Sequence, residues 1–320
     1  MKEQLQFVRG AVAKKDFVPV LQSFRIRNST VLGFNGELAL CSPLACDLDV
    51  APVASSLVKA LTACEGTVSL HYDAELRKLV VHSGKVGVFV PCLENADWPD
   101  IRPEGETLSL GAPLLPALRS LQPFIGQDAS RPWSRGVLLR GSSAFATNNV
   151  ILAEAWVGAE LARSVNIPEN AVTELLRIGQ EPERLLVTET SLCAMFAGGA
   201  WLRTQLLSAD WPDVTAMLDE AQWDNLPALP AGLLEAVETL SPFVDDVGRI
   251  HLFDGFASTS AQPDKDGASA PAPCSAPGCF HFSQLLALKG VATNVRLGAY
   301  PSPCPFTGEA LRGVIVGMRV

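Results

Sequence analysis

The pentapeptide ADWPD occurs twice, at Ala96–Asp100 and at Ala209–Asp213, and it marks an internal repeat. Three short segments rich in β-branched residues precede each pentapeptide and predict three strands. A short amphipathic segment that follows a proline lies ahead of each set of three strands and predicts a helix. Each pentapeptide therefore ends the same order of elements, a helix followed by three strands. The expected helices are Ser55–Cys64 and Glu169–Ile178, and the expected strands are 67–72, 78–83 and 86–91 in the first copy and 184–189, 191–196 and 201–207 in the second.

A second self-match reveals a third copy. Leu114–Ile125 aligns without gaps on Leu233–Val244; both predict amphipathic helices that end at a Pro-Phe pair, and Leu5–Ala13 is a weaker match to the same opening helix. The third copy closes with an expected helix in 281–290 and strands in 294–300 and 313–320. The sequence therefore predicts three domains, at 1–106, 107–222 and 223–320, with a low-complexity loop at 258–278.

Composition narrows the class of protein. A chain of 320 residues with 48% hydrophobic residues and a net charge of −9 is globular and long enough for more than one core. It has no apolar run of about 18 residues and no signal peptide, so we expect a soluble, cytoplasmic protein. Eight cysteines without an export signal predict free thiols.

The sequence contains no recognisable catalytic constellation. Trp-Pro-Asp is also found in tyrosine phosphatase loops, but those enzymes need an arginine six places after a nucleophilic cysteine, and none of the eight cysteines has one. Cys274, Cys279 and His281 are three potential metal ligands, although their spacing fits no standard zinc module. We expect a non-enzyme without cofactor or metal; an enzyme with an unrecognised site near Cys274–His281 remains a rival hypothesis.

Several motifs, taken in order, resemble the bacterial DNA polymerase III beta sliding clamp family, the processivity clamps. The segment from Asp128 to Val137 is similar to that family's D-x-x-R-x-x-x-x-G-V, and 145–148 is similar to its A-T-D-G. The second ADWPD resembles its strand-then-F-P-D-Y joint, and the C-terminal VIVGMRV resembles its V-V-M-P-M-R-L. The first copy matches more loosely, through 17–21 and the first ADWPD. The resemblance covers nearly the whole chain and suggests a divergent member of the family, of bacterial or bacteriophage origin.

The resemblance implies an α+β chain of three tandem clamp domains, with helices inside and antiparallel sheets outside, that pairs head-to-tail with a second chain as a ring around duplex DNA. The six expected inner helices and their flanks carry eight basic and five acidic side chains, an excess of basic charge in an acidic protein. The basic residues include the expected DNA-binding residues: Arg9, Lys14, Lys15, Lys59, Arg119, Arg177 and Lys289. Among these, Lys15 resembles a family position that touches DNA.

The family also binds short peptide motifs of polymerases and clamp loaders in a pocket between its second and third domains. The resemblance places that pocket at Thr147, Val150, Ile151, Leu152, Asp219, Val314, Val316 and Met318. Apolar walls with a flexible Met suit a groove that serves several peptides, but the same residues also suit an inter-domain core. Val150 and Ile151 replace a His-Arg pair of the family and Asp219 replaces a proline, so the peptide consensus is open.

Two functions remain after these observations. The first is a sliding clamp that tethers a replicative polymerase to DNA. The second is a clamp-like decoy or inhibitor that binds replication partners without encircling DNA, which the acidic residues Glu235 and Glu238 on the third copy's first helix favour.

Overall fold

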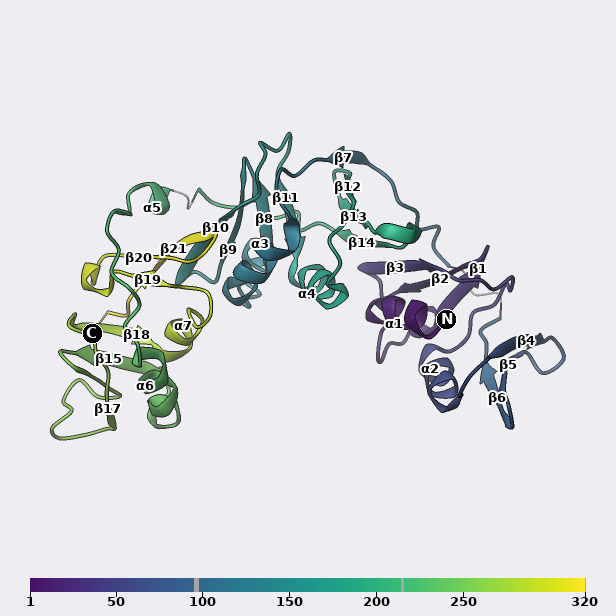
Figure 1. Cartoon of the computed structure of the whole chain (residues 1–320), viewed down its shortest axis with the longest axis horizontal. Coiled ribbons are helices and arrows are strands. Elements are labelled where there is room, and N and C mark those ends of the chain that lie inside the picture. Colours follow the sequence, from purple (N-terminus) through teal and green to yellow (C-terminus); the bar gives the residue numbers. More distant parts are fainter. Residues whose placement is uncertain (95–97, 214–215, 320) are drawn as a thin grey trace. The chain divides into compact units, whose positions relative to one another are not determined.

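The computed structural model describes residues 1–94, 98–213 and 216–319, which form two compact units. We call Met1–Ser109 with Thr173–Leu206 the N-terminal unit, and Leu110–Val172 with Leu207–Val320 the C-terminal unit. Both units contain helices and antiparallel sheets, which confirms the predicted α+β class (Figure 1). No helix in the described part of the chain has the length and apolar character needed to cross a membrane.

The N-terminal unit contains a seven-stranded sheet in which every neighbouring pair is antiparallel. In spatial order its strands are β1 (Phe24–Arg27), β2 (Thr30–Phe34), β3 (Leu38–Pro43), β14 (Trp201–Gln205), β13 (Ser191–Met195), β12 (Arg184–Val187) and β7 (Glu106–Leu108). The central pair joins strands that are far apart in sequence, with Trp201 opposite Cys41. The first and second copies of the repeat therefore share one sheet.

Three α-helices accompany the described residues of this unit. They are α1 (Lys2–Val8), which continues as the 3-10 helix η1 (Arg9–Ala11), α2 (Ala54–Ala63), and the part of α4 (Glu169–Ile178) from Thr173 onward. α1 packs against β2 and β3, and it approaches β2 so closely that a Cβ atom on Gly33 would lie 2.6 Å from the Val8 carbonyl oxygen. α2 buries Ala54, Leu57 and Leu61, which lie on one face of a helix.

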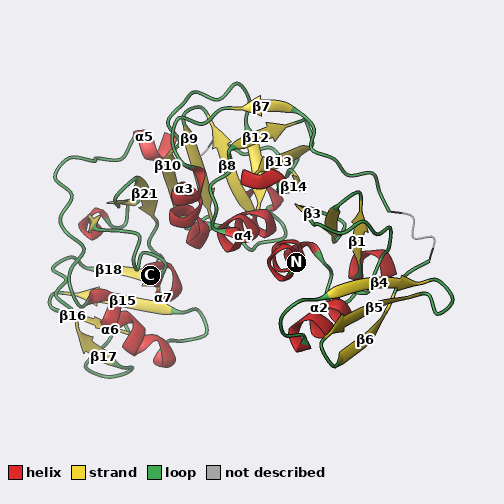
Figure 2. Cartoon of the chain, turned by 45° about the vertical axis from the view of Figure 1, so that its right-hand side comes forward, coloured by secondary structure: helices red, strands yellow, loops and turns green. Residues whose placement is uncertain are grey.

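A smaller antiparallel sheet of the same unit packs beside α2 (Figure 2). Its strands are β4 (Ser69–Asp73), β5 (Lys78–Ser83) and β6 (Val86–Pro91). In β5 the side chains of Leu79, Val81 and Ser83 are buried and alternate with more exposed ones, as expected for a sheet with one face on a core. These strands and α2 confirm the elements predicted for the first copy.

The C-terminal unit repeats this plan. Its seven-stranded antiparallel sheet runs in the order β11 (Val165–Pro168), β8 (Gly136–Arg140), β9 (Ser143–Thr147), β10 (Ile151–Trp156), β21 (Leu311–Ile315), β20 (Cys304–Thr307) and β19 (Asn294–Val295). Its four-stranded sheet runs in the order β17 (Ser269–Pro271), β16 (Phe256–Ser258), β15 (Arg249–Phe253) and β18 (Gly278–His281). Here β10 and β21 pair, with Leu152 opposite Val314, so that strands of the second and third copies share a sheet.

The helices of this unit, apart from the first residues of α4, are α3 (Leu114–Leu121), α5 (Ala216–Asp219), α6 (Leu233–Leu240) and α7 (Phe282–Leu286). Both α3 and α6 give way to a 3-10 turn that contains the predicted Pro-Phe pair, because proline has no N–H group to continue the α-helical hydrogen bonds. α3 packs on β9 and β10, and α6 packs on β16, β17 and α7.

Two sequence expectations need correction. The segment 258–278 is not a loop throughout, because β17 pairs with β16 within it and Ala272 is fully buried. The segment 294–300 is not one strand, since β19 ends at Val295 and the 3-10 helix η7 (Leu297–Ala299) follows.

Candidate nucleic-acid interface

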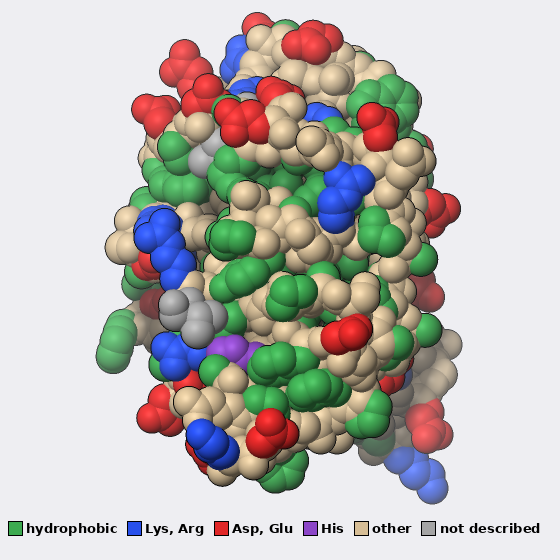
Figure 3. Space-filling view, turned by 90° about the vertical axis from the view of Figure 1, so that its left-hand side faces the viewer, with side chains coloured by type: hydrophobic (Ala, Val, Ile, Leu, Met, Phe, Trp, Pro, Cys, Tyr) green, Lys and Arg blue, Asp and Glu red, His purple; other side chains and the backbone are tan. Residues whose placement is uncertain are grey.

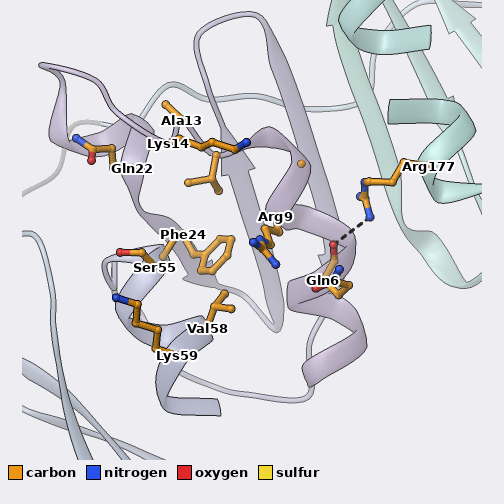
Figure 4. Close-up of a pocket in the computed structure, with 13 residues that line it drawn as sticks. Gln6, Arg9, Ala13, Lys14, Gln22, Phe24, Ser55, Val58, Lys59 and Arg177 are labelled. Atoms are coloured by element: carbon orange, nitrogen blue, oxygen red, sulfur yellow. Dashed lines mark hydrogen bonds between the residues drawn. The ribbon is translucent and has the colours of Figure 1, made fainter. Parts of the chain in front are cut away.

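A cavity of about 500 Å³ in the N-terminal unit brings together four of the seven predicted DNA-binding residues, Arg9, Lys14, Lys59 and Arg177 (Figure 4). None of the residues that line it is acidic. Arg9 comes from η1, Lys14 from the segment that follows, Lys59 from the exposed face of α2 and Arg177 from the last turn of α4. The sequence predicted these residues separately; their convergence on one cavity comes from the fold.

Arg177 is already engaged within the unit. Its Nε atom donates to Glu174 Oε1 at 2.8 Å, and its terminal nitrogens donate to the carbonyl oxygens of Phe7 at 2.7 Å and Gln6 at 3.3 Å. Those carbonyls end α1, where a cation is stabilised by the unsatisfied groups and the helix dipole. Glu174 is only 8% exposed, so its partner neutralises a buried carboxylate. The guanidinium of Arg177 therefore joins α1 to α4, with little left to bind a phosphate.

Lys289 is also paired. It lies after α7 in the C-terminal unit, and its Nζ donates to Glu238 Oε2 of α6 at 2.7 Å. This hydrogen bond raises the pKa of Lys289 above its usual value, and the charge of Glu238 adds to the effect. By contrast, across the described residues no carboxylate lies within ion-pair distance of the remaining predicted cations. These are Arg9, Lys14, Lys15, Lys59 and Arg119, and all five are exposed.

The sequence analysis missed Phe17, two residues after Lys15. Its side chain is 104% exposed, more than that of any other exposed large hydrophobic residue in the described part of the chain. The signal in the sequence was an aromatic residue directly after the KKD tripeptide, which combines cations with a ring. Gln22, which lines the cavity, was also missed; its Nε2 donates to the carbonyl oxygen of Asp16 at 2.8 Å and so holds this loop.

Seven of the eight predicted peptide-pocket residues lie in or next to β9, β10 and β21 of the C-terminal unit, and the eighth, Asp219, ends α5, which contacts β21. They fall into two groups. Thr147, Ile151, Leu152 and Val314 are buried, whereas Val150, Val316, Met318 and Asp219 reach the surface. Backbone hydrogen bonds fix this arrangement: Val316 N donates to Val150 O at 2.9 Å, and Thr147 Oγ1 donates to Ile151 O at 2.6 Å.

This region also contains half-buried aromatic and sulfur-containing side chains, which the sequence analysis did not include. Leu152 and Val314 belong to an apolar cluster with Leu138, Phe145 and Leu218, against which Met217, Trp211 and Trp223 pack. One face of the C-terminal unit carries apolar side chains across much of its surface (Figure 3). Trp211, from the second ADWPD, contacts Trp133 at 5.2 Å between ring centroids, so this pentapeptide anchors a core. In the first ADWPD, Ala96 and Asp97 lie outside the described residues.

Within the described ranges, no group of three or more His, Cys, Asp and Glu side chains is arranged to hold a metal ion. Cys274 and Cys279 are buried, and the Nδ1 atom of His281 accepts from the Ser283 amide at 3.2 Å. Burial raises the pKa of Cys41, Cys193 and Cys304 to about 11, 12 and 11, respectively, so these thiols are poor nucleophiles at neutral pH.

No family model matches the sequence, and no curated protein sequence matches it. Among solved structures, the DNA polymerase III subunit beta of Pseudomonas aeruginosa is similar with a TM-score of 0.81 at 20% identity. The Helicobacter pylori beta clamp bound to a DNA ligase peptide gives 0.80 at 13%, and the Bacillus subtilis sliding clamp gives 0.79 at 17%. Each match covers 100% of this chain and 97% of the other. The chain therefore has the fold of the bacterial DNA polymerase III beta sliding clamps over its whole length.

Proposed function

We propose that this protein is a DNA sliding clamp, a non-catalytic, cytoplasmic subunit that encircles duplex DNA as a homodimeric ring and tethers a replicative polymerase. The observation that carries the proposal is the likeness to beta sliding clamps along the entire chain, at TM-scores near 0.8. The three predicted domains, 1–106, 107–222 and 223–320, supply the repeating parts of such a ring.

The strand order supports ring closure by a second chain. In both seven-stranded sheets, the last strand of one copy pairs with the third strand of the copy before it, as β14 pairs with β3 and β21 with β10. The remaining sheets have three strands, with β6 at one edge, and four strands, with β17 at one edge. In this pattern β6 of one chain pairs with β17 of its partner, which completes a third seven-stranded sheet and covers two open edges.

The unpaired cations support contact with a phosphate backbone. Arg9, Lys14, Lys15, Lys59 and Arg119 are exposed and free of carboxylate partners among the described residues, although the chain as a whole carries a net charge of −9. Contacts with phosphates do not depend on the base sequence, so the protein can remain bound while it slides along the DNA.

We also propose that polymerase and clamp-loader peptides bind at Val150, Val316, Met318 and Asp219, next to the apolar cluster of the C-terminal unit. Exposed apolar atoms beside half-buried Met217 and Trp223 give a peptide side chain a surface on which to bury itself. One structural neighbour, from Helicobacter pylori, is bound to a DNA ligase peptide, and peptide binding at this cluster fits that likeness.

The decisive test is topological. The protein is loaded onto nicked circular duplex DNA by a clamp loader, and the amount retained after gel filtration is measured before and after a restriction enzyme linearises the DNA. A ring stays on the circle and slides off the linear molecule. Equal retention on both forms would refute encirclement, and a monomer by light scattering at micromolar concentration would refute the homodimer.

The second candidate function, a clamp-like decoy, is favoured by the Glu238–Lys289 pair. In that pair Glu238 neutralises Lys289, the one predicted DNA-binding cation of the third copy, while the acidic Glu235 on the same helix keeps its negative charge. A decoy lowers the processivity of a polymerase that already has its own clamp, whereas a clamp raises the processivity of a polymerase that has none. Product length on a primed circular template, with and without the clamp loader, separates the two functions.

A further inference from the structure

The loop that contains Lys14, Lys15 and Phe17 holds an aromatic ring away from every other side chain. Phe17 is 104% exposed and its neighbour Val18 is 51% exposed. The loop is nevertheless ordered by local hydrogen bonds, since Asp16 Oδ1 accepts from the Val18 amide at 2.8 Å and the Asp16 carbonyl accepts from Gln22 at 2.8 Å. The ring is thus presented to solvent next to two lysines and has no role in any core.

The cavity beside this loop combines an apolar floor with a cationic rim (Figure 4). Val12, Ala13 and Val58 are half-buried and supply the floor, and Arg9 and Lys59 stand at the rim with Lys14. Its volume of about 500 Å³ lies within the range of about 300–1,000 Å³ that small-ligand pockets occupy.

We propose that this cavity and loop bind unpaired nucleotides of a DNA strand. One base enters the cavity against Val12 and Val58, its flanking phosphates contact Arg9, Lys14 and Lys59, and an adjacent base stacks on Phe17. The inference rests on the proposed DNA-binding function and specifies the form of DNA that the N-terminal unit prefers, namely a single-stranded stretch such as the template beyond a primer end.

The chemistry favours single strands over duplex. A duplex presents phosphates, which need only the cations, while its bases are stacked on one another and cannot use an apolar floor or an isolated ring. An unpaired strand offers both, and stacking of a base on an aromatic side chain does not depend on sequence. A protein partner is disfavoured because two exposed lysines, Lys14 and Lys15, lie within three residues of Phe17 and suit an anionic strand.

The test measures fluorescence anisotropy of a labelled 12-nucleotide oligothymidylate, an abasic strand of equal length and a 12-base-pair duplex. We expect Phe17→Ala to weaken thymidylate binding roughly 5- to 150-fold and leave duplex binding within about twofold, whereas Phe17→Trp retains both. Trp156→Ala, which removes an exposed aromatic of the C-terminal unit, is the matched control. The abasic strand keeps its phosphates, so it binds the native protein and Phe17→Ala equally weakly.

The cations are tested separately. Lys59→Ala weakens both single-strand and duplex binding and lowers the salt slope for single strands by roughly 0.7, the value for one phosphate contact. Arg184→Ala, at an exposed site of the same unit that does not line the cavity, leaves binding unchanged. An unaltered slope for Lys59→Ala would overturn the assignment of this cavity.

Three results overturn the proposal. The first is equal affinity of the native protein for abasic and thymidylate strands, and the second is a Phe17→Ala protein that binds thymidylate normally. The third is displacement of the strand by micromolar thymidine triphosphate, which would assign the cavity to free nucleotides. If the native protein is retained on circular duplex and any of these three results is obtained, only this inference fails. If the native protein neither binds single strands nor is retained on circular duplex, the proposed function fails too.

Discussion

Gly10 lies where any side chain would collide with the buried carboxylate of Glu174. A Cβ atom on Gly10 would lie 1.8 Å from Oε1, 2.2 Å from Cδ and 2.4 Å from Oε2 of Glu174. The φ angle of Gly10, within η1, is outside the left-handed region, so the backbone itself accepts alanine. We therefore expect the cost of Gly10→Ala to come entirely from displacement of Glu174.

The size of the effect follows from the contacts that are lost. Ordinary contact with a Cβ atom begins near 3.4 Å, so the carboxylate must move by more than 1 Å, which breaks its 2.8 Å hydrogen bond to Arg177. A hydrogen bond to a charged group contributes about 1.5–3 kcal/mol, and Arg177 retains some access to water, so we expect Gly10→Ala to lower the free energy of unfolding by about 2 kcal/mol. In a Glu174→Ala background the collision is gone, and the same change should stabilise by roughly 0.5 kcal/mol, the helix preference of alanine over glycine.

The assay is urea unfolding monitored by hydrogen exchange of peptides from α1 and from the part of α4 after Val172, which report on the N-terminal unit alone. Gly298→Ala is the control, because this glycine also lies in a 3-10 helix but its nearest contact, Ala276 Cβ, is at 3.6 Å. The coupling between Gly10 and Glu174 should be about 2–3 kcal/mol. If Gly10→Ala costs the same in both backgrounds, Glu174 is not what requires glycine here and the reasoning is wrong.

Three further predictions follow from the structure. Phe89→Asp, at an exposed position of edge strand β6, should convert the proposed dimer to a monomer by light scattering, and an unchanged mass would exclude β6 from the interface. Cys41 and Cys193, whose pKa values burial raises to about 11 and 12, should resist iodoacetamide at pH 8 in the folded protein, as read by mass spectrometry. Burial lowers the pKa of His251 below 6.5, with Arg249 adding to the effect, so protonation favours the unfolded state. Stability of the C-terminal unit should thus be full above pH 6.5 and fall as the pH drops below it, and His251→Gln should abolish that dependence.

The sequence predicted local elements well wherever apolar periodicity is strong. Both Pro-Phe helices were placed correctly because Leu114, Leu118 and Leu121 recur at helical spacing and so do their counterparts in α6. The trios of strands before each ADWPD were also correct, since alternation of β-branched residues is a local property. The pairing of strands between copies was not predicted, because the pairing of Trp201 with Cys41 depends on contacts between distant segments.

The residues of the candidate site also depend on contacts between distant segments, which the sequence does not predict. Charge alone selected Arg177 and Lys289 as DNA-binding residues, but each has a carboxylate partner in the structure. Glu174 could have been suspected, because it stands three places before Arg177 on one helix face, whereas Glu238 lies 51 residues from Lys289. Phe17 went unnoticed because a single aromatic residue in a loop has no periodicity that distinguishes an exposed ring from a buried one.

The distribution of unpaired cations predicts how the proposed clamp stays on DNA. Three of the five, Arg9, Lys14 and Lys59, line one cavity of the N-terminal unit, and Arg119 is the only one that the C-terminal unit contributes within the described residues. Affinity for duplex DNA rises with the number of phosphates neutralised, so only five free cations among the predicted DNA-binding residues imply weak binding to linear duplex. Long residence on DNA must then come from ring closure and not from charge. Raising the salt concentration should therefore abolish binding to linear duplex well before it releases the protein from closed circles.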